Sequence, residues 1–310
     1  MCLFRSIQIF KAKRINTTIK YSNSLKRIPM PSCEHWCNFV GFQNSSETKN
    51  QLSNNFINKT MILEDDLSSY CFDEIAGNGT DIQKTLRLMQ WLTDHTFYSG
   101  MSTQFIKDRT SDILQTCVNK SFKYAINCRF KAIALTDMLL SIGIHAIPLL
   151  LLGVTPTYNG KPTYPNHFMV HVYSKNERRW FLVDPSFNLH FTYNGKLLDI
   201  IELSELLSRN IYPNLIGYNL NGSTTDNIEL YKNLFLKSCI EFICTWESGK
   251  RNYDKLFECQ FNYILEPRNY SLLEALKKIN AKTFLGESIQ NGYPQKLRRI
   301  NVDDLLSCEE

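Results

Sequence analysis

The sequence predicts an α+β fold in which helices come first and a run of antiparallel strands follows. Between about residues 82 and 142 the apolar residues recur at helical spacing, and from residue 167 they alternate with a period of two. The dipeptide Asn194-Gly195, between two short strand-like segments, is a strong signal for a two-residue β-hairpin. Helices followed by neighbouring strands, without regular alternation, are typical of the α+β class.

Two of the predicted helices have clear starting signals. Thr80 and Gln83 form a capping box at the start of the first helix. After a short helix over Ser111–Val118, the segment Cys128–Ile142 is apolar on nearly every side, which is typical of a helix buried in the core. Gly143 directly follows it and fits the left-handed stop of a helix.

The strands are predicted from residue alternation and from turns. Ala146–Val154 is expected to be a buried strand, and the loop Thr155–Asn166 is expected to overhang the site and shape specificity. His167, Met169, His171 and Tyr173 share one face of the next strand, which the turn Lys175–Arg179 joins to Trp180–Asp184. Trp180 is expected to pack under this hairpin. Further elements are expected as a helix from Ser204, a helix around Ile228–Lys237, and strands over Cys239–Trp246 and Phe261–Leu265.

Composition narrows the class of protein. The 310 residues are 43% hydrophobic and 21% charged, an ordinary globular balance. No run of about 18 apolar residues occurs, so we expect no membrane association. The net charge of +5 is spread along the chain, and we therefore expect no nucleic-acid partner. Without a secretory signal pattern, a cytoplasmic protein with mostly reduced cysteines is expected.

The chain divides into a peripheral segment and one domain. Residues 1–60 are polar, Asn/Ser/Lys-rich and weakly periodic, so we expect them to be peripheral or poorly ordered. Residues 61–310 are expected to form a single domain, with its core over 80–210 and a C-terminal helix and strands over 225–268. Cys33-Glu-His-Trp-Cys37 lacks a second ligand pair at zinc-finger spacing, so no metal and no cofactor are expected.

Cys128 is the candidate nucleophile because it begins the core helix. The positive end of a helix dipole and a nearby imidazolium both stabilise a thiolate. Amides at the same helix end could bind the oxyanion formed when a thiolate attacks a carbonyl. A cysteine followed by a histidine and an aspartate suits thiol acyl transfer. Among ten cysteines and six histidines, however, that order arises by chance in most chains, and a free cysteine is often simply buried.

The residues alone leave the histidine open. A hairpin that turns at Lys175-Asn176 places His167 opposite Asp184, whereas one that turns at Glu177-Arg178 places His171 there. Neither loop contains a glycine that would select a turn type.

Three stretches in this order resemble the transglutaminase-like superfamily, and bacterial transglutaminase-like domain proteins most of all. They are Asn127-Cys-Arg-Phe-Lys-Ala-Ile-Ala-Leu-Thr-Asp-Met-Leu-Leu-Ser-Ile-Gly-Ile-His-Ala146, Asn166-His-Phe-Met-Val-His-Val-Tyr-Ser174 and Trp180-Phe-Leu-Val-Asp-Pro-Ser-Phe-Asn188. In that family a cysteine begins a helix, a histidine begins a strand, and a tryptophan and Asp-Pro occur on the next strand. The resemblance covers about residues 80–210 and extends more weakly to about 268.

The resemblance implies a papain-like core in which a buried cysteine helix packs against an antiparallel sheet carrying the histidine and aspartate. Cys128 would be the nucleophile and Asp184 the orienting acid. His167 would be the catalytic histidine, because the family places it at the start of the strand, and His171 would line the site or lie in the core. Attack on an amide would give a thioester acyl-enzyme and release an amine or ammonia.

The acceptor of the acyl group is open. Water as acceptor, giving a peptidase or amidase, is favoured because a cross-linking enzyme must exclude water. A cross-linking transglutaminase and a non-catalytic peptide-binding module are the alternatives. No acidic loop resembles an EF-hand, so calcium activation is not expected. A protein or peptide substrate is expected, the oligomeric state is open, and the second oxyanion donor is Asn127, Tyr124 or a backbone amide.

Overall fold

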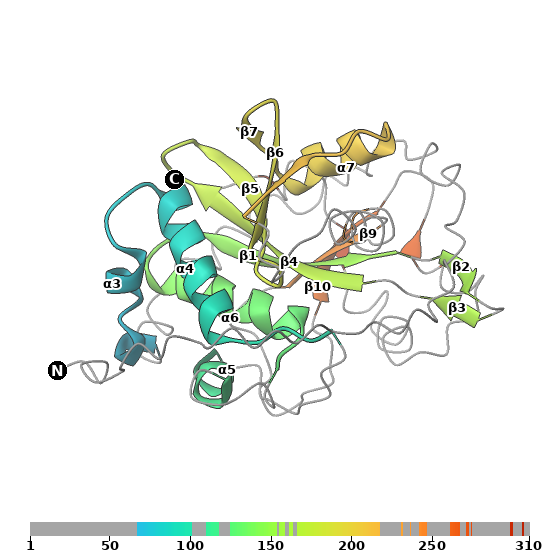
Figure 1. Ribbon diagram of the computed structural model, residues 1–310. Helices are drawn as coiled ribbons and strands as arrows, with labels where there is room; N and C mark the ends of the chain where they lie inside the picture. Colours follow the sequence, from blue (N-terminus) through green and yellow to red (C-terminus); the bar gives the residue numbers. More distant parts are fainter. Residues whose placement is uncertain are drawn as a thin grey trace, which may run out of the picture.

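The computed structural model describes residues 67–100, 110–117, 125–153, 155–158, 161–163 and 166–217, and then 231, 236, 242–246, 261–266, 271, 272, 274, 298–299 and 306. Within these residues, helices and a large, mainly antiparallel sheet form an α+β structure (Figure 1), as predicted. The segment 1–60 and the Cys33–Cys37 cluster lie outside the described residues. The boundary between the two predicted parts of the chain therefore stays a prediction.

Capping residues set where two of the helices begin. The helices are η1 (Ser68–Tyr70), α3 (Phe72–Ala76), α4 (Asp81–His95), α5 (Thr110–Cys117), α6 (Cys128–Ser141) and α7 (Ile200–Ser208). The predicted capping box of Thr80 and Gln83 begins α4. Helix α7 begins before the predicted Ser204, because Asp199 and Glu202 form a second capping box that we did not expect.

One sheet contains most of the strands. The strands are β1 (Ala146–Leu152), β2 (Thr155–Tyr158), β3 (Lys161–Thr163), β4 (Asn166–Ser174), β5 (Arg179–Asp184), β6 (Leu189–Tyr193), β7 (Lys196–Leu197), β8 (Asn214–Ile216), β9 (Phe242–Trp246), β10 (Phe261–Leu265) and β11 (Arg298–Arg299). The main sheet has the order β11-β10-β9-β1-β4-β5-β6-β7, with β8 beside β6. All pairs are antiparallel except β10 with β11.

Two predicted connections have different outcomes. Asn194 and Gly195 join β6 to β7 with φ of 51° and 76°, which confirms the predicted hairpin. The prediction of a loop over Thr155–Asn166 is wrong in part, because β2 and β3 pair antiparallel within it. Tyr158 lies opposite Lys161, so the chain reverses there as a hairpin and not as an irregular loop.

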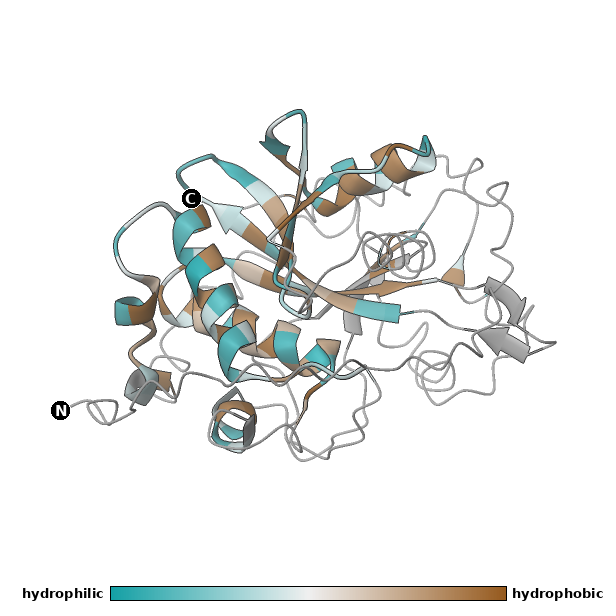
Figure 2. Cartoon of the chain, viewed as in Figure 1, coloured by the Kyte–Doolittle hydropathy of each residue, from teal (hydrophilic) through white to brown (hydrophobic). Residues whose placement is uncertain are grey.

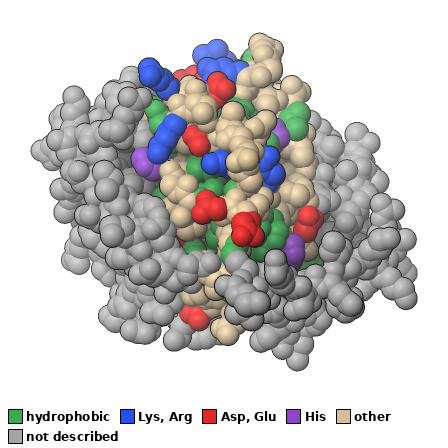
Figure 3. All heavy atoms as spheres, turned by 90° about the vertical axis from the view of Figure 1, so that its left-hand side faces the viewer, with side chains coloured by type: hydrophobic (Ala, Val, Ile, Leu, Met, Phe, Trp, Pro, Cys, Tyr) green, Lys and Arg blue, Asp and Glu red, His purple; other side chains and the backbone are tan. Residues whose placement is uncertain are grey.

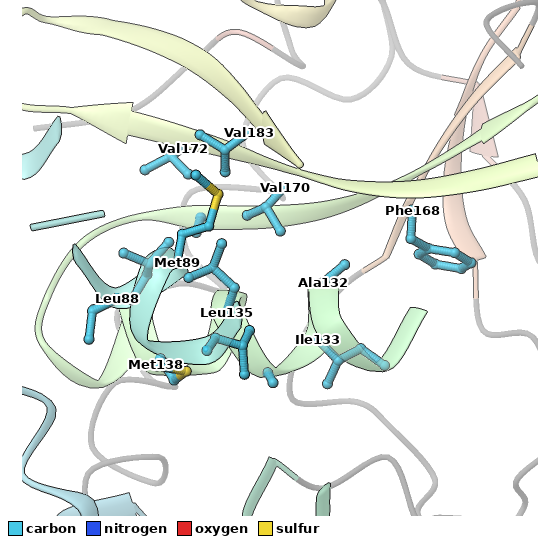
Figure 4. Packing of buried hydrophobic residues seen from close by; sticks show 14 of the residues in the cluster. Leu88, Met89, Ala132, Ile133, Leu135, Met138, Phe168, Val170, Val172 and Val183 are labelled. Carbon is cyan, nitrogen blue, oxygen red and sulfur yellow. The ribbon is translucent and has the colours of Figure 1, made fainter. Parts of the chain in front are cut away.

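The two faces of the sheet contact different helices. Phe168, Val170 and Val172 of β4 face the cluster formed with α4 and α6 (Figure 4). Met169 and Tyr173 face the second cluster, which includes the apolar side of α7. Helix α7 accordingly lies across the sheet from α4 and α6 (Figure 1). Hydrophobic positions recur along these helices and the strands between them (Figure 2).

Helix α6 is the core helix that the sequence predicted. It packs against β1, β4, α4 and α5, and its residues from Phe130 to Leu140 are all buried. Gly143 follows with φ of 75°, in the left-handed region that a helix stop requires. Because α6 is enclosed on almost every side, its first residue occupies a defined position relative to β4.

Charged side chains of both signs lie on the same face of the surface. On the face that carries α3 and α4, Lys and Arg side chains are interspersed with Asp and Glu (Figure 3). No helix in the described part of the chain is both long and apolar enough to cross a membrane.

Two cysteines differ in state. Cys128 is a free thiol, whereas Cys71 is disulfide-bonded. The expectation that most of the ten cysteines are reduced stays a prediction.

Candidate active site

Cys128 is the first residue of α6, and its side chain is partly exposed. Asn127 precedes it with extended backbone, and the Asn127 Oδ1 atom accepts a hydrogen bond from the Phe130 amide at 3.2 Å. This cap fixes the beginning of the helix at Cys128. The thiol therefore lies at the positive end of the helix dipole and is not fully buried.

A short pairing holds the chain just before Cys128. The Ile126 amide donates to the Phe97 carbonyl at 2.8 Å, and the Ser99 amide donates to the Ile126 carbonyl at 2.9 Å. Between them, the Tyr98 ring packs edge-on against Phe187 at a centroid distance of 5.0 Å. The segment after α4 thus lies beside the approach to the thiol.

His167 is the second residue of β4 and forms a buried pair with Asp184 at the end of β5. The His167 Nε2–H donates to Asp184 Oδ2 at 2.8 Å, and both side chains are 0% exposed. Because Nε2 is engaged with the carboxylate, Nδ1 is the ring nitrogen through which the imidazole could act on Cys128. The structure thus brings His167 and Asp184 into contact, and Cys128 is close enough to influence the same imidazole.

The hairpin that carries this pair has neither of the two registers that we considered. Val170 pairs with Val183, and Ser174 pairs with Arg179. The chain therefore turns about Asn176 and Glu177, and this register sets Met169 opposite Asp184. The carboxylate contacts a histidine diagonally across the two strands and not directly opposite, which is within reach for long side chains.

The diagonal position separates the two histidines. His167 and His171 lie two residues on either side of Met169, on the same face of β4. His167 binds Asp184, whereas the His171 ring stacks on Trp180 at a centroid distance of 4.8 Å. Trp180 is buried beneath the hairpin, as expected, and its Nε1–H donates to the Leu306 carbonyl at 2.7 Å.

The surroundings of His167 favour its protonated form. Burial alone would lower its pKa, but the charge of Asp184, the hydrogen bond to it, and the hydrogen bond and charge of Cys128 together raise the pKa to about 10. At neutral pH the ring is therefore an imidazolium between a carboxylate and the thiol.

His171 has the opposite character. Burial lowers its pKa to about 3, and within the described part of the chain neither ring nitrogen has a hydrogen-bond partner. It is thus a neutral core residue that lacks the satisfied hydrogen bonds we expected of a core histidine.

Asp184 receives three hydrogen bonds in its buried position. Besides His167, the Tyr231 hydroxyl donates to Oδ2 at 2.7 Å and the Ser186 amide donates to Oδ1 at 2.8 Å. Tyr231 was not expected at the site, since it lies 47 residues after Asp184 in a segment without a recognisable motif. A buried tyrosine hydroxyl needs a partner, but no sequence pattern indicates which one.

The loop after Asp184 is anchored from two sides. Asn188 Nδ2 donates to Gln90 Oε1 of α4 at 2.6 Å and to the Gly217 carbonyl at 3.2 Å. A Cβ at Gly217, where φ is 87°, would lie 2.7 Å from the Asn188 carbonyl oxygen, so glycine is required at this contact. These contacts give Asn188, the last residue of the third stretch that resembles the family, a structural role in holding the loop after Asp184.

The structure describes two of the three candidates for an oxyanion donor. The side-chain oxygen of Asn127 accepts in the helix cap, so its Nδ2 group is the part of this side chain that could donate to an oxyanion, and Tyr124 lies outside the described residues. The backbone amide of Cys128 is not used by that cap and points in the same direction as the other first-turn amides. Among described residues, no group of three or more His, Cys, Asp or Glu side chains is placed to hold a metal ion.

Comparisons with known proteins give one match. Residues 70–185 match the family model described as the Transglutaminase-like superfamily, from η1 to the residue after Asp184. This range contains Cys128 and His167 but not Tyr231. Neither curated proteins nor solved structures gave a match. Residues 70–185 of this chain are therefore a transglutaminase-like superfamily domain.

Proposed function

We propose that the protein catalyses thiol-dependent acyl transfer on an amide of a protein or peptide, through a thioester acyl-enzyme, with water as the usual acceptor. The observation that supports this proposal is the continuous connection from Cys128 through the His167 imidazole to the Asp184 carboxylate. Its elements are a partly exposed thiol at a helix start and a buried imidazolium whose orientation is fixed.

The first half of the reaction uses the ion pair. The thiolate of Cys128 attacks the carbonyl carbon, a carbon–sulfur bond forms, and the negative charge moves to the carbonyl oxygen near the first amides of α6. When this tetrahedral intermediate collapses, the carbon–nitrogen bond breaks. His167 Nδ1 gives its proton to the departing nitrogen, so that an amine or ammonia leaves and a thioester remains.

The second half regenerates the enzyme. Neutral His167 takes a proton from water, the resulting hydroxide attacks the thioester carbon, and the carbon–sulfur bond breaks. A carboxylic acid leaves, and the thiolate–imidazolium pair is restored. Asp184 keeps the imidazole oriented in both halves and stabilises its positive charge. An amine in place of water would give cross-linking through the same thioester.

Trapping of the thioester tests this proposal. The protein is incubated with a peptide library, quenched in acid, and examined by mass spectrometry for an acyl adduct on the peptide that contains Cys128. An adduct is expected with the native protein and is expected to be absent with Cys128→Ser. His171→Phe is the matched histidine control and should retain the adduct, whereas His167→Ala should lose it.

The same samples separate the acceptors. In oxygen-18 water, a hydrolytic enzyme releases carboxylic acid that carries one heavy oxygen, whereas a cross-linking enzyme transfers the acyl group to an added primary amine. If no library member acylates Cys128 and the thiol reacts no faster than a model thiol, the enzymatic proposal is wrong. A non-catalytic peptide-binding module would then be favoured.

A further inference from the structure

Tyr231 closes a ring of four buried side chains around the acid of the site. Its hydroxyl donates to Asp184 Oδ2, which also accepts from His167. Its ring packs edge-on against Phe187 at a centroid distance of 5.1 Å, and the Phe187 ring lies 5.9 Å from the His167 ring. Each of the four residues therefore contacts two others of the same group.

This arrangement restricts how the carboxylate can rotate. Tyr231 and His167 donate to Oδ2, while the Ser186 amide donates to Oδ1 from the opposite side. Donors on both oxygens hold the carboxylate plane, and the hydrogen bond to His167 depends on that plane. Tyr231 is only 2% exposed, so it also keeps water from the oxygen that binds the imidazole.

We propose that Tyr231 is a positioning residue of this site, which holds the Asp184 carboxylate in the orientation that binds His167. The consequence for the imidazole rests on the proposed function, but the contact with Asp184 does not. Tyr231 lies outside residues 70–185, in the same apolar cluster as β9 and β10. The C-terminal part of the chain thus supplies a residue that completes the site.

The titratable groups that the described residues bring to this carboxylate are few. His167 approaches from β4 and Tyr231 from the C-terminal part, while Cys128 of α6 lies beyond the imidazole. Tyr231→Phe removes one of the two donors on Oδ2, while the phenyl ring still packs on Phe187. With one donor fewer, the carboxylate is less restrained, and its hydrogen bond to His167 should weaken.

The test compares the full-length protein with Tyr231→Phe by NMR of labelled histidine. The downfield signal of the His167 Nε2–H proton, which reports its hydrogen bond to Asp184, should shift and broaden when the carboxylate loses its second donor on Oδ2. Tyr173→Phe removes the hydroxyl of a buried tyrosine in the same apolar cluster and should leave this signal in place. A His167 signal in Tyr231→Phe that coincides with that of the native protein would overturn the proposal.

Two further measurements keep the result clear. Tyr231→3-fluorotyrosine, whose hydroxyl is a stronger donor, should shift the His167 Nε2–H signal without disturbing the packing, and an unshifted signal would count against the proposal even if Tyr231→Phe were unfolded. Alkylation of Cys128 is followed in parallel. A His167 signal that shifts while Cys128 is unreactive supports the role of Tyr231 and refutes the proposed function, whereas a reactive Cys128 with an unshifted His167 signal does the reverse.

Discussion

Two positions on strand β4 (Asn166–Ser174) hold a histidine in contrasting states. His167 and His171 lie on one face of the strand, four residues apart, and both are fully buried. The pKa of His171 is lowered to about 3 by burial, whereas that of His167 is raised to about 10. The difference is Asp184, whose charge and hydrogen bond outweigh the cost of burying an imidazolium. Burial alone thus makes His171 a neutral packing residue, whereas burial beside the Asp184 carboxylate makes His167 a charged residue of the candidate site.

The largest expected effect is on the pKa of His167, when the charge of Asp184 is removed. Asp184→Asn keeps the shape of the side chain but leaves His167 with burial as the dominant influence, so the pKa of His167 should fall from about 10 to below its ordinary value, toward that of His171. NMR titration of labelled histidine measures this change. Asp137→Asn alters another buried carboxylate, which accepts from Thr110, and should leave His167 unchanged. A His167 that still titrates near pH 10 in Asp184→Asn would contradict the comparison.

The reactivity of Cys128 should show the next largest effect. Under the proposed function the His167 imidazolium activates the sulfur, so iodoacetamide should alkylate Cys128 at pH 6 roughly 100-fold faster than a model thiol. His167→Ala should remove most of this advantage, and His171→Phe should retain it. Mass spectrometry of the peptide that contains Cys128 separates its alkylation from that of the other cysteines. Equal loss in both variants would show that the two histidines do not differ in function.

Acid stability tests the other histidine. The pKa of His171 in the folded state is about 3, below its ordinary value of 6.5. Between these two pH values the unfolded chain therefore binds a proton that the folded chain does not bind. The free energy of unfolding should therefore fall as pH drops from about 6.5 toward 3, by up to about 1.4 kcal/mol per pH unit. His171→Phe should remove this slope and should be the more stable protein at pH 4 by denaturant unfolding. An unchanged slope in His171→Phe would show that a group other than His171 causes the loss of stability in acid.

For His167 the change of stability with pH has the opposite sign. Its raised pKa means that the folded chain holds a proton that the unfolded chain releases between about 6.5 and 10. The stability that the pair contributes is complete below pH 6.5 and is lost as pH rises toward 10. Urea unfolding between pH 7 and 10 should show this decline in the native protein, and His167→Ala should not show it. The decline should also be present in His171→Phe, which makes the two histidines distinguishable by sign alone.

The smallest effect is expected at the helix start. Asn127→Ala removes the side-chain oxygen that accepts from the Phe130 amide and should cost about 1 kcal/mol of stability in thermal or denaturant unfolding. Asn127→Ser, which restores a capping oxygen, is the matched control. If the variants also alter Cys128 alkylation in proportion, the cap contributes to the position of the thiol as well as to the stability of α6.

Several features of this protein follow from the sequence because their signals are local. The capping box at Thr80, the all-round apolar pattern of Cys128–Ile142, and the hairpin at Asn194-Gly195 each depend on residues within a few positions of one another. The start of α7 was missed although its capping box is equally local. There the apolar run that begins at Leu197 obscured the start signal at Asp199.

The tertiary structure alone decided two contacts of Asp184, one with a histidine that the sequence left open and one with a tyrosine far along the chain. The turn after Ser174 lacks a residue that selects a register, so the sequence left both histidines open, and strand pairing placed Asp184 diagonally between them. Tyr231 reaches Asp184 across 47 residues, a distance over which no periodic pattern extends. The sequence by itself determined the helix that begins at Cys128 and the shared face of His167 and His171. Which histidine pairs with Asp184 depended on the strand register of the folded sheet and on how far the side chains extend.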